Sequence, residues 1–183
     1  MAALYRMATS RGGGLRVAVT TRGGTGRIVL SRQFGGAVMI AAWNPPVVRL
    51  LDLHAGCERD PARAARILGL GSLPLSAVPL LLGGRLPAGH ITEDPAGGGW
   101  VALAAPGWRC RVRLAPEPWR VVALETPDGT RITFSSHTAS VPGRVRITRP
   151  DGTWFTLELV RLEWDTSTVL PPLPGLPPCG AAG

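Results

Sequence analysis

Lysine is absent from this 183-residue sequence, so all 20 of its basic residues are arginine. No lysine amine is available for Schiff-base catalysis, which excludes that chemistry. The formal net charge of +8 suggests contact with nucleic acid or with anionic lipid head groups. However, a lack of lysine beside abundant alanine, glycine, proline and arginine is typical of GC-rich coding sequences. The charge therefore does not select a partner on its own.

Residues with catalytic or metal-binding chemistry are few and scattered. The three cysteines, Cys57, Cys110 and Cys179, lack metal-type spacing and leave one thiol unpaired if two join, so they do not settle the redox compartment. The three histidines lie far apart in the sequence, and no Gly-x-Ser-x-Gly motif occurs. We therefore expect no catalytic residues, no metal and no cofactor, in a protein that is not an enzyme.

Long apolar runs are also missing. The sequence has no stretch of about twenty uncharged apolar residues that could span a bilayer, and residues 1–14 contain no signal-peptide core. Residues 54–57, His-Ala-Gly-Cys, resemble the tail of a bacterial lipobox. The prolines and charged residues just before them instead predict a turn at a strand end.

Turn-forming residues are abundant, with 24 glycines and 18 prolines placed between short apolar runs. This pattern predicts a mainly β fold, with one domain over 1–165 and a proline-rich tail over 166–183. We expect an antiparallel β-barrel of about ten strands, closed or half-closed, because a twisted sheet of that size curls and closure hides its edges. The strands are expected at 15–20, 27–31, 37–43, 47–53, 100–105, 109–114, 119–125, 130–135, 144–149 and 153–164, with 4–7 as the stub of an edge strand.

Residues 60–87 form the one long segment with a helical pattern. Asp60 is expected to cap a first helix and Ser76 a second short helix, which Gly83 ends. Two helices inserted midway must cover the concave face or one mouth of the sheet. The residues alone leave two interpretations open: a plug at the end of an ordinary core, or a leucine-rich lid over an apolar cavity.

Arginine alternates with apolar residues on two of the expected strands, 109–114 and 144–149. This alternation predicts one charged and one apolar face. The six tryptophans stand at strand starts or ends, where they either close the rim of the barrel or contact a ligand. Tryptophan interleaved with arginine also suits single-stranded nucleic acid, so a basic β-barrel that binds nucleic acid is the alternative function.

Residues 68–87, LGLGSLPLSAVPLLLGGRLP, resemble the helical insertion of the LolA/LolB-like lipoprotein localisation superfamily, in particular of the outer-membrane lipoprotein receptors. The surrounding segments follow in the same order as in that superfamily. They are the early hairpin at 22–26, the run 119–134 with its Asp-Gly turn, and the run 144–164. The resemblance extends over residues 15–164.

This resemblance implies an open barrel with a helical lid, whose apolar interior accepts lipid or lipoprotein acyl chains. It implies a monomeric, LolB-like bacterial chaperone in outer-membrane lipoprotein localisation, in the periplasm or at the inner face of the outer membrane. Its partners would be a periplasmic carrier and that membrane surface. The lid residues that contact the acyl chain would be Leu68, Leu70, Leu73, Leu75, Val78, Leu81 and Leu82.

Two features depart from the superfamily pattern. In the receptor an exposed apolar residue serves lipoprotein insertion, but the matching hairpin at 22–26 is Arg-Gly-Gly-Thr-Gly and has none. The chain also begins near what would be an early strand of the family fold, without the N-terminal helix, signal peptide and acylated cysteine. We therefore expect an N-terminally truncated relative, in which lipid binding follows from the resemblance more directly than lipoprotein insertion.

Overall fold

A computed structural model of the chain describes residues 1–10, 12, 14–44, 46–61, 70–78, 81, 86, 89–93, 98–116, 119–138, 141–164 and 170–180. The strands are β1 (Ala2–Thr9), β2 (Gly14–Arg22), β3 (Thr25–Arg32), β4 (Ala37–Asn44), β5 (Val47–Asp52), β6 (Cys57–Arg59), β7 (His90–Glu93), β8 (Trp100–Ala105), β9 (Trp108–Pro116), β10 (Trp119–Glu125), β11 (Arg131–Ser135), β12 (Arg144–Thr148) and β13 (Trp154–Glu163). The named helical element is the 3-10 helix η2 (Leu75–Ala77). None of the helical residues described forms a span long and apolar enough to cross a membrane. The predicted mainly β fold is confirmed.

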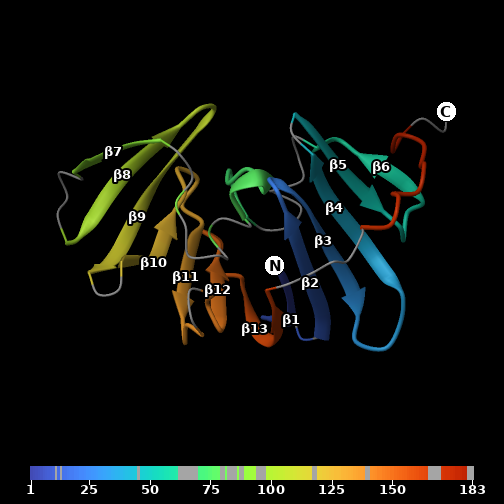
Figure 1. Cartoon of the computed structure of the whole chain (residues 1–183), viewed down its shortest axis with the longest axis horizontal. Helices are drawn as coiled ribbons and strands as arrows, with labels where there is room; N and C mark the ends of the chain where they lie inside the picture. The colour runs from blue at the N-terminus through green and yellow to red at the C-terminus, as the bar shows by residue number, and fades with distance from the viewer. Residues whose placement is uncertain are drawn as a thin grey trace.

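The strands pair in one antiparallel sheet, in the order β6-β5-β4-β3-β2-β1-β13-β12-β11-β10-β9-β8-β7 (Figure 1). Neighbours in the sheet follow one another in sequence except where β1 pairs with β13 and joins the two ends of the chain. The sheet is unclosed, with β6 and β7 at its edges. The predicted open antiparallel architecture is therefore confirmed.

The prediction of about ten strands is wrong, because the described sheet has thirteen. Residues 4–7 belong to β1, an eight-residue strand that lies between β2 and β13 rather than at an edge. The other unpredicted strands, β6 and β7, are three and four residues long. Strands this short show too little alternation to be recognised in a sequence.

Register shifts interrupt the strand pairing at Leu4/Tyr5, Leu30/Ser31 and Val121/Ala123. An extra residue on one strand of a pair bends that strand and increases its twist. The sheet curls into a half-barrel, whose two arms face each other across the concave side in Figure 1.

Glycine-containing turns connect several strands as the sequence predicts. Pro-Asp-Gly turns join β10 to β11 and β12 to β13, with Gly129 and Gly152 at φ values of +80° and +79°. The β2–β3 hairpin turns at Gly23 and Gly24, which both have positive φ. A two-residue hairpin whose twist matches its strands requires that conformation.

Residues 70–78, which lie between β6 and β7 in the sequence, are placed on the open side of the half-barrel (Figure 1). The predicted two-helix lid is not present in the described part of this segment, and the first expected helix falls on 62–69, outside the described residues. The 3-10 helix η2 has Pro74 as its N-cap, and the second helix expected after Ser76 extends into residues 79–80 and 82–83, outside the described residues. Pro74 cannot donate a helical hydrogen bond, and Gly71 has a φ of +63°, so both interrupt a longer helix.

The C-terminal tail is held along the β6 edge by a disulfide. Cys57 of β6 is bonded to Cys179, with the two Cα atoms 4.9 Å apart, while Cys110 remains a buried free thiol. The Glu58 N–H donates to the Pro177 carbonyl at 2.7 Å, and the Cys179 N–H donates to the Glu58 carbonyl at 2.9 Å. These bonds occupy main-chain groups that an edge strand otherwise leaves open to another chain.

The tail also lies against the convex face of β3 and β5. Arg27 donates to the Pro171 carbonyl at 2.5 Å, and Arg49 donates to the Pro174 carbonyl at 3.5 Å. The side chain of Leu51 on β5 points to the convex face, because its neighbour Leu50 points inward, and Leu51 is nevertheless fully buried. The convex face is therefore covered on this arm of the half-barrel.

Candidate functional site

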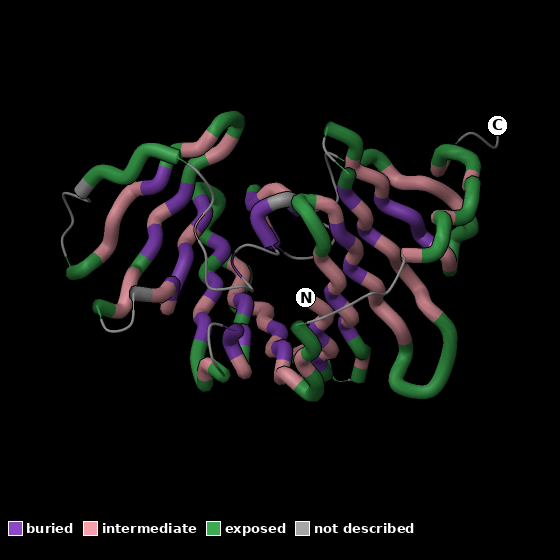
Figure 2. Tube along the Cα trace, in the orientation of Figure 1, coloured by how far each residue is buried: buried purple, intermediate pink, exposed green. Residues whose placement is uncertain are grey.

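Alternation along the strands gives the concave face an apolar surface. Every second residue points inward and is buried, as in β2, where Val17 and Val19 are 6% and 1% exposed. The register sets these residues side by side across strands, with Val17 opposite Tyr5 on one side and Leu30 on the other. Together the inward residues form the hydrophobic core, which Figure 2 shows as alternating buried positions.

The capping segment, defined as residues 70–78 together with Leu81, supplies the other side of this core. In Figure 1 its helix η2 lies between the two arms of the sheet. Its apolar side chains belong to the same buried cluster as the strand residues. These buried side chains are Leu70, Leu73, Leu75, Ala77, Val78 and Leu81.

Gly71 determines how closely the capping segment approaches the β10–β11 turn. A Cβ atom on Gly71 would lie 2.7 Å from both Asp128 Oδ1 and Thr130 Oγ1. The turn itself is well tied, since the Thr126 N–H donates to the Thr130 carbonyl at 3.0 Å and the Thr126 hydroxyl donates to the Asp128 carboxylate. Only a residue without a Cβ permits this contact.

A cavity of about 60 Å³ lies between the capping segment and the sheet. Leu70 and Val78 line it from the capping segment. The residues that line it from the sheet are also apolar and come from β1, β2, β3, β12 and β13: Met7, Val17, Val19, Ile28, Leu30, Ile147, Phe155 and Leu157. Ligand pockets measure about 300–1,000 Å³, so a hydrocarbon chain can enter only if the capping segment moves away.

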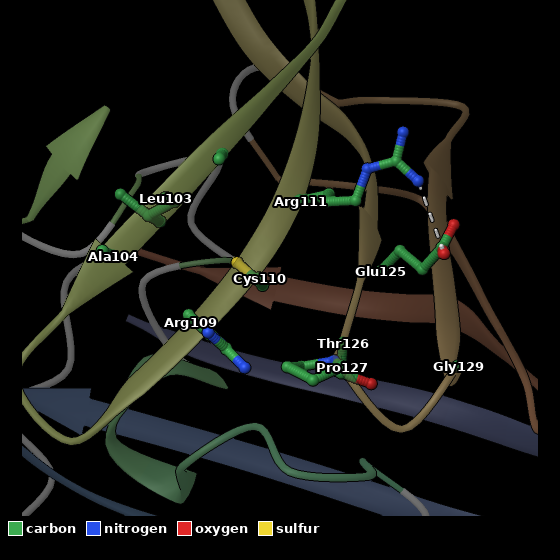
Figure 3. Close-up of a pocket in the computed structure, with 10 residues that line it drawn as sticks. Leu103, Ala104, Arg109, Cys110, Arg111, Glu125, Thr126, Pro127 and Gly129 are labelled. Carbon is green, nitrogen blue, oxygen red and sulfur yellow. Dashed lines mark ion pairs between the residues drawn. The ribbon is translucent and has the colours of Figure 1, made fainter. Parts of the chain in front are cut away.

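A larger cavity of about 420 Å³ lies where the pairing of β9 with β10 ends (Figure 3). Its walls come from β8, β9, the end of β10 and the turn that follows. The lining residues are Ala102, Leu103, Ala104, Arg109, Cys110, Arg111, Glu125, Thr126, Pro127 and Gly129. Arg111 and Glu125 pair across it at 3.7 Å. No residue predicted to contact a ligand lines this cavity.

Buried ionisable groups do not form a catalytic set in the described part of the chain. Burial raises the pKa of the Cys110 thiol to about 11, so this thiol stays protonated at neutral pH. Burial also raises the pKa of Tyr5, whose hydroxyl has no hydrogen-bond partner among the described residues. The pKa of His137 is lowered, mainly by burial. Across the ranges that the structure describes, no group of three His, Cys, Asp or Glu side chains could hold a metal ion.

The structure brings five of the seven predicted lid residues into one core. Leu70 and Val78 line the smaller cavity, and Leu73, Leu75 and Leu81 are buried beside it. The other two, Leu68 and Leu82, lie outside the described residues. The strand side of the site was not predicted, because alternation shows which residues share a face but only the register shows which strands meet there.

An exposed aromatic side chain stands at the turn between β3 and β4. Phe34 is 88% exposed, in a turn where the Arg32 N–H donates to the Gly36 carbonyl at 3.4 Å. The hairpin at 22–26 has no apolar residue, whereas this next hairpin presents one to solvent. Sequence reasoning overlooked Phe34 because exposure depends on where the strands end.

The fold and the site define an open antiparallel half-barrel whose apolar concave face is capped by the segment that joins its edges. A solved domain from Vibrio parahaemolyticus, named as an outer membrane lipoprotein-sorting protein domain, is similar to this chain. The TM-score is 0.46 and the sequence identity 13%, over 92% of this chain and 86% of that chain. No protein-family model and no curated protein matches the chain.

Proposed function

We propose that this protein binds lipid or lipoprotein acyl chains on its concave face, as a non-enzymatic protein with a LolB-like role. The observation that carries the proposal is the apolar cavity between the capping segment and the sheet. The core is closed by a segment that lies outside the strand pairing of the sheet. The capping segment can therefore move away without breaking a strand pair, which gives an acyl chain a route to the apolar face.

In this proposal the acyl chain takes the place of the capping side chains against the strands. Burial contributes about 0.8 kcal/mol for each methylene, so about ten methylenes contribute about 8 kcal/mol. That free energy corresponds to about micromolar affinity before the cost of opening is subtracted. Leu70 and Val78 would contact the chain first, since they line the cavity. The other lid residues in the proposal are Leu68, Leu73, Leu75, Leu81 and Leu82.

We also propose that Phe34 contacts a membrane or a carrier protein while the ligand is transferred. Its support is the 88% exposure of the ring at the end of a hairpin. An exposed phenyl ring gains free energy when an apolar surface covers it. This role is the one that the resemblance assigns to an exposed apolar residue, placed one hairpin later.

The disulfide supports a location outside the cytoplasm. Disulfides such as Cys57–Cys179 form and persist in oxidising compartments, the bacterial periplasm among them. We therefore propose the periplasm or the inner face of the outer membrane, a periplasmic carrier as partner, and a monomer. We also propose that residues 1–165 form one half-barrel domain and 166–183 an appended tail.

The proposal is tested by the uptake of a fluorescent fatty-acid analogue. The purified protein should bind it saturably, and Val78→Phe should weaken binding at least about tenfold, because the larger side chain fills the cavity. A charge at Leu81 should also weaken uptake, but it threatens folding as well, so Val78→Phe is the sharper variant. Val47→Phe is the matched control, since Val47 is 56% exposed on β5. The proposal fails if uptake is not saturable, or if both phenylalanine variants bind like the parent protein.

A further inference from the structure

The convex face of the half-barrel carries a dense group of arginines on the strands that the tail does not cover. The arginine face is defined by eight arginines that point outward from β9, β11, β12, β1 and β2, together with the two glutamates that lie among them. Its members are Arg6, Arg16, Arg109, Arg111, Arg113, Arg131, Arg144 and Arg146, with Glu125 and Glu158 among them. Eight arginines less two glutamates leave a surplus of six positive charges, out of a formal charge of +8 for the whole chain.

Ion pairs neutralise only part of this face. Glu158 pairs with both Arg6 and Arg144 at 2.7 Å, and Glu125 lies 3.7 Å from Arg111. The remaining arginines have no carboxylate partner in the part of the chain that the structure describes: Arg16, Arg109, Arg113, Arg131 and Arg146. An anionic partner would therefore meet charges that the protein does not already balance.

Two tryptophans on the same face hold arginines in place. Arg111 and Arg131 lie over the Trp100 ring, 5.2 and 5.7 Å from its centroid, and Arg146 lies 4.6 Å from the centroid of Trp154. A guanidinium stacked on a ring uses its flat side, which leaves the N–H donors at its edge free to bind phosphate oxygens. The stacking therefore orients phosphate-binding groups across several strands.

The same stacking argues against single-stranded nucleic acid as the partner. Proteins that bind such strands offer open aromatic faces on which bases stack. Here guanidinium groups cover the rings of Trp100 and Trp154, and Trp43, a third tryptophan, is 4% exposed in the core. A two-dimensional array of phosphates, as on a bilayer surface, fits a broad arginine face better than a strand of stacked bases.

We propose that the arginine face binds the surface of a bilayer that contains anionic phospholipids. Guanidinium groups on neighbouring strands would contact several lipid phosphates at once, and the tryptophan rings suit the interface between water and hydrocarbon. This face lies opposite the proposed acyl-chain site, so the inference does not depend on the proposed function.

The test is co-sedimentation of the full chain with vesicles of pure phosphatidylcholine and with vesicles containing about 30% phosphatidylglycerol. Binding should occur on the anionic vesicles alone and should weaken strongly between about 50 and 300 mM salt. Arg113→Gln with Arg146→Gln should reduce the affinity about 25-fold, at about fivefold for each arginine. The matched control is Arg32→Gln with Arg149→Gln, which removes the same charge from the end of β3 and from the residue after β12, both outside the arginine face.

Three outcomes would overturn the inference. Equal losses in the two double variants would mean that net charge alone attracts the protein. Equal, salt-insensitive binding to both kinds of vesicle would mean that an apolar contact such as Phe34 holds the membrane, a result that concerns the proposed function instead. Tighter binding to an oligothymidylate than to anionic vesicles, with the same loss in the Arg113/Arg146 variant, would assign the face to nucleic acid.

Discussion

At the scale of single residues, Phe34 and Val78 show how position decides the role of an apolar side chain. Phe34 is 88% exposed and Val78 is 8% exposed. Val78 packs against strands from both ends of the chain, so it contributes to the stability of the core. Phe34 lies in a turn away from that core, so its ring is available to another molecule.

Phe34→Ser should slow the transfer of a bound fatty-acid analogue from the protein to vesicles by about tenfold, because covering a phenyl ring is worth about 1.5–3 kcal/mol. Stopped-flow fluorescence measures that rate. The free energy of unfolding should change by less than about 0.5 kcal/mol, since the side chain is on the surface. Val160→Ser is the control, because Val160 is also exposed, at 63%, but lies on β13. Equal transfer rates in the two variants would contradict the proposed role.

At the scale of elements, the capping segment is a short, weakly structured piece of chain that nevertheless completes the core. Its helix η2 has no side-chain cap, so little holds it except burial of its leucines and the contact at Gly71. This combination suits an element that must leave the sheet and return. Its closed position lowers the apparent affinity for a ligand by the fraction of molecules that are open.

Gly71→Ala should loosen the capping segment, because the added Cβ would lie 2.7 Å from oxygen atoms of Asp128 and Thr130. The fatty-acid analogue should then bind more tightly, since less free energy is needed to open the site. Gly152→Ala is the matched control: Gly152 also has a positive φ, of +79°, but no atom lies within 4 Å of its Cβ position. Both variants should lose about 1–2 kcal/mol of stability from backbone strain alone. Weaker binding by Gly71→Ala would contradict the account of the capping segment.

At the scale of the whole molecule, two long-range contacts tie the ends of the chain to the sheet. β1 pairs with β13, which brings the two ends of the half-barrel sequence together, and the disulfide fixes the tail to the β6 edge. The β1–β13 pairing joins the two halves of the sheet, and the disulfide holds the tail over one edge and part of the convex face. In the half-barrel the capping segment covers the concave face, whereas the arginine face on the convex side stays uncovered.

Cys57→Ser with Cys179→Ser should lower the free energy of unfolding by up to about 4–5 kcal/mol on the chain-entropy model, because the bond closes a loop with a sequence separation of 122. Urea unfolding measures the change. A reducing agent should destabilise the parent protein by a similar amount and leave the double variant unaffected. No effect of the reducing agent on the parent would mean that the two thiols are not joined.

Local patterns predicted much of the fold, while long-range contacts could not be predicted. Alternation and the Pro-Asp-Gly turns located most strands, because both are properties of a few neighbouring residues. The role of β1 was missed because its partner lies at the other end of the chain, as the contact between Arg6 and Glu158 shows. The cysteine pairing was open for the same reason, since spacing cannot choose among three thiols.

The candidate site was predicted on one side only. The resemblance identified the capping side chains, including Leu70 and Val78, while the helical pattern predicted more helix than the described segment contains. Pro74 and Gly71 oppose helix there, and burial rather than helical periodicity positions the leucines. The arginine face was visible as alternation on single strands, but its continuity across strands depends on the register.

Hydrogen exchange with and without bound fatty acid tests the central claim most directly. In the capping segment the Leu73 N–H donates to the Leu70 carbonyl at 3.2 Å, and the Ala77 N–H donates to the Pro74 carbonyl at 3.0 Å. If an acyl chain takes the place of this segment on the concave face, these amides should exchange faster when ligand is bound, while those of β1 to β3 stay protected. Saturable binding that leaves exchange in residues 70–78 unchanged would contradict the account.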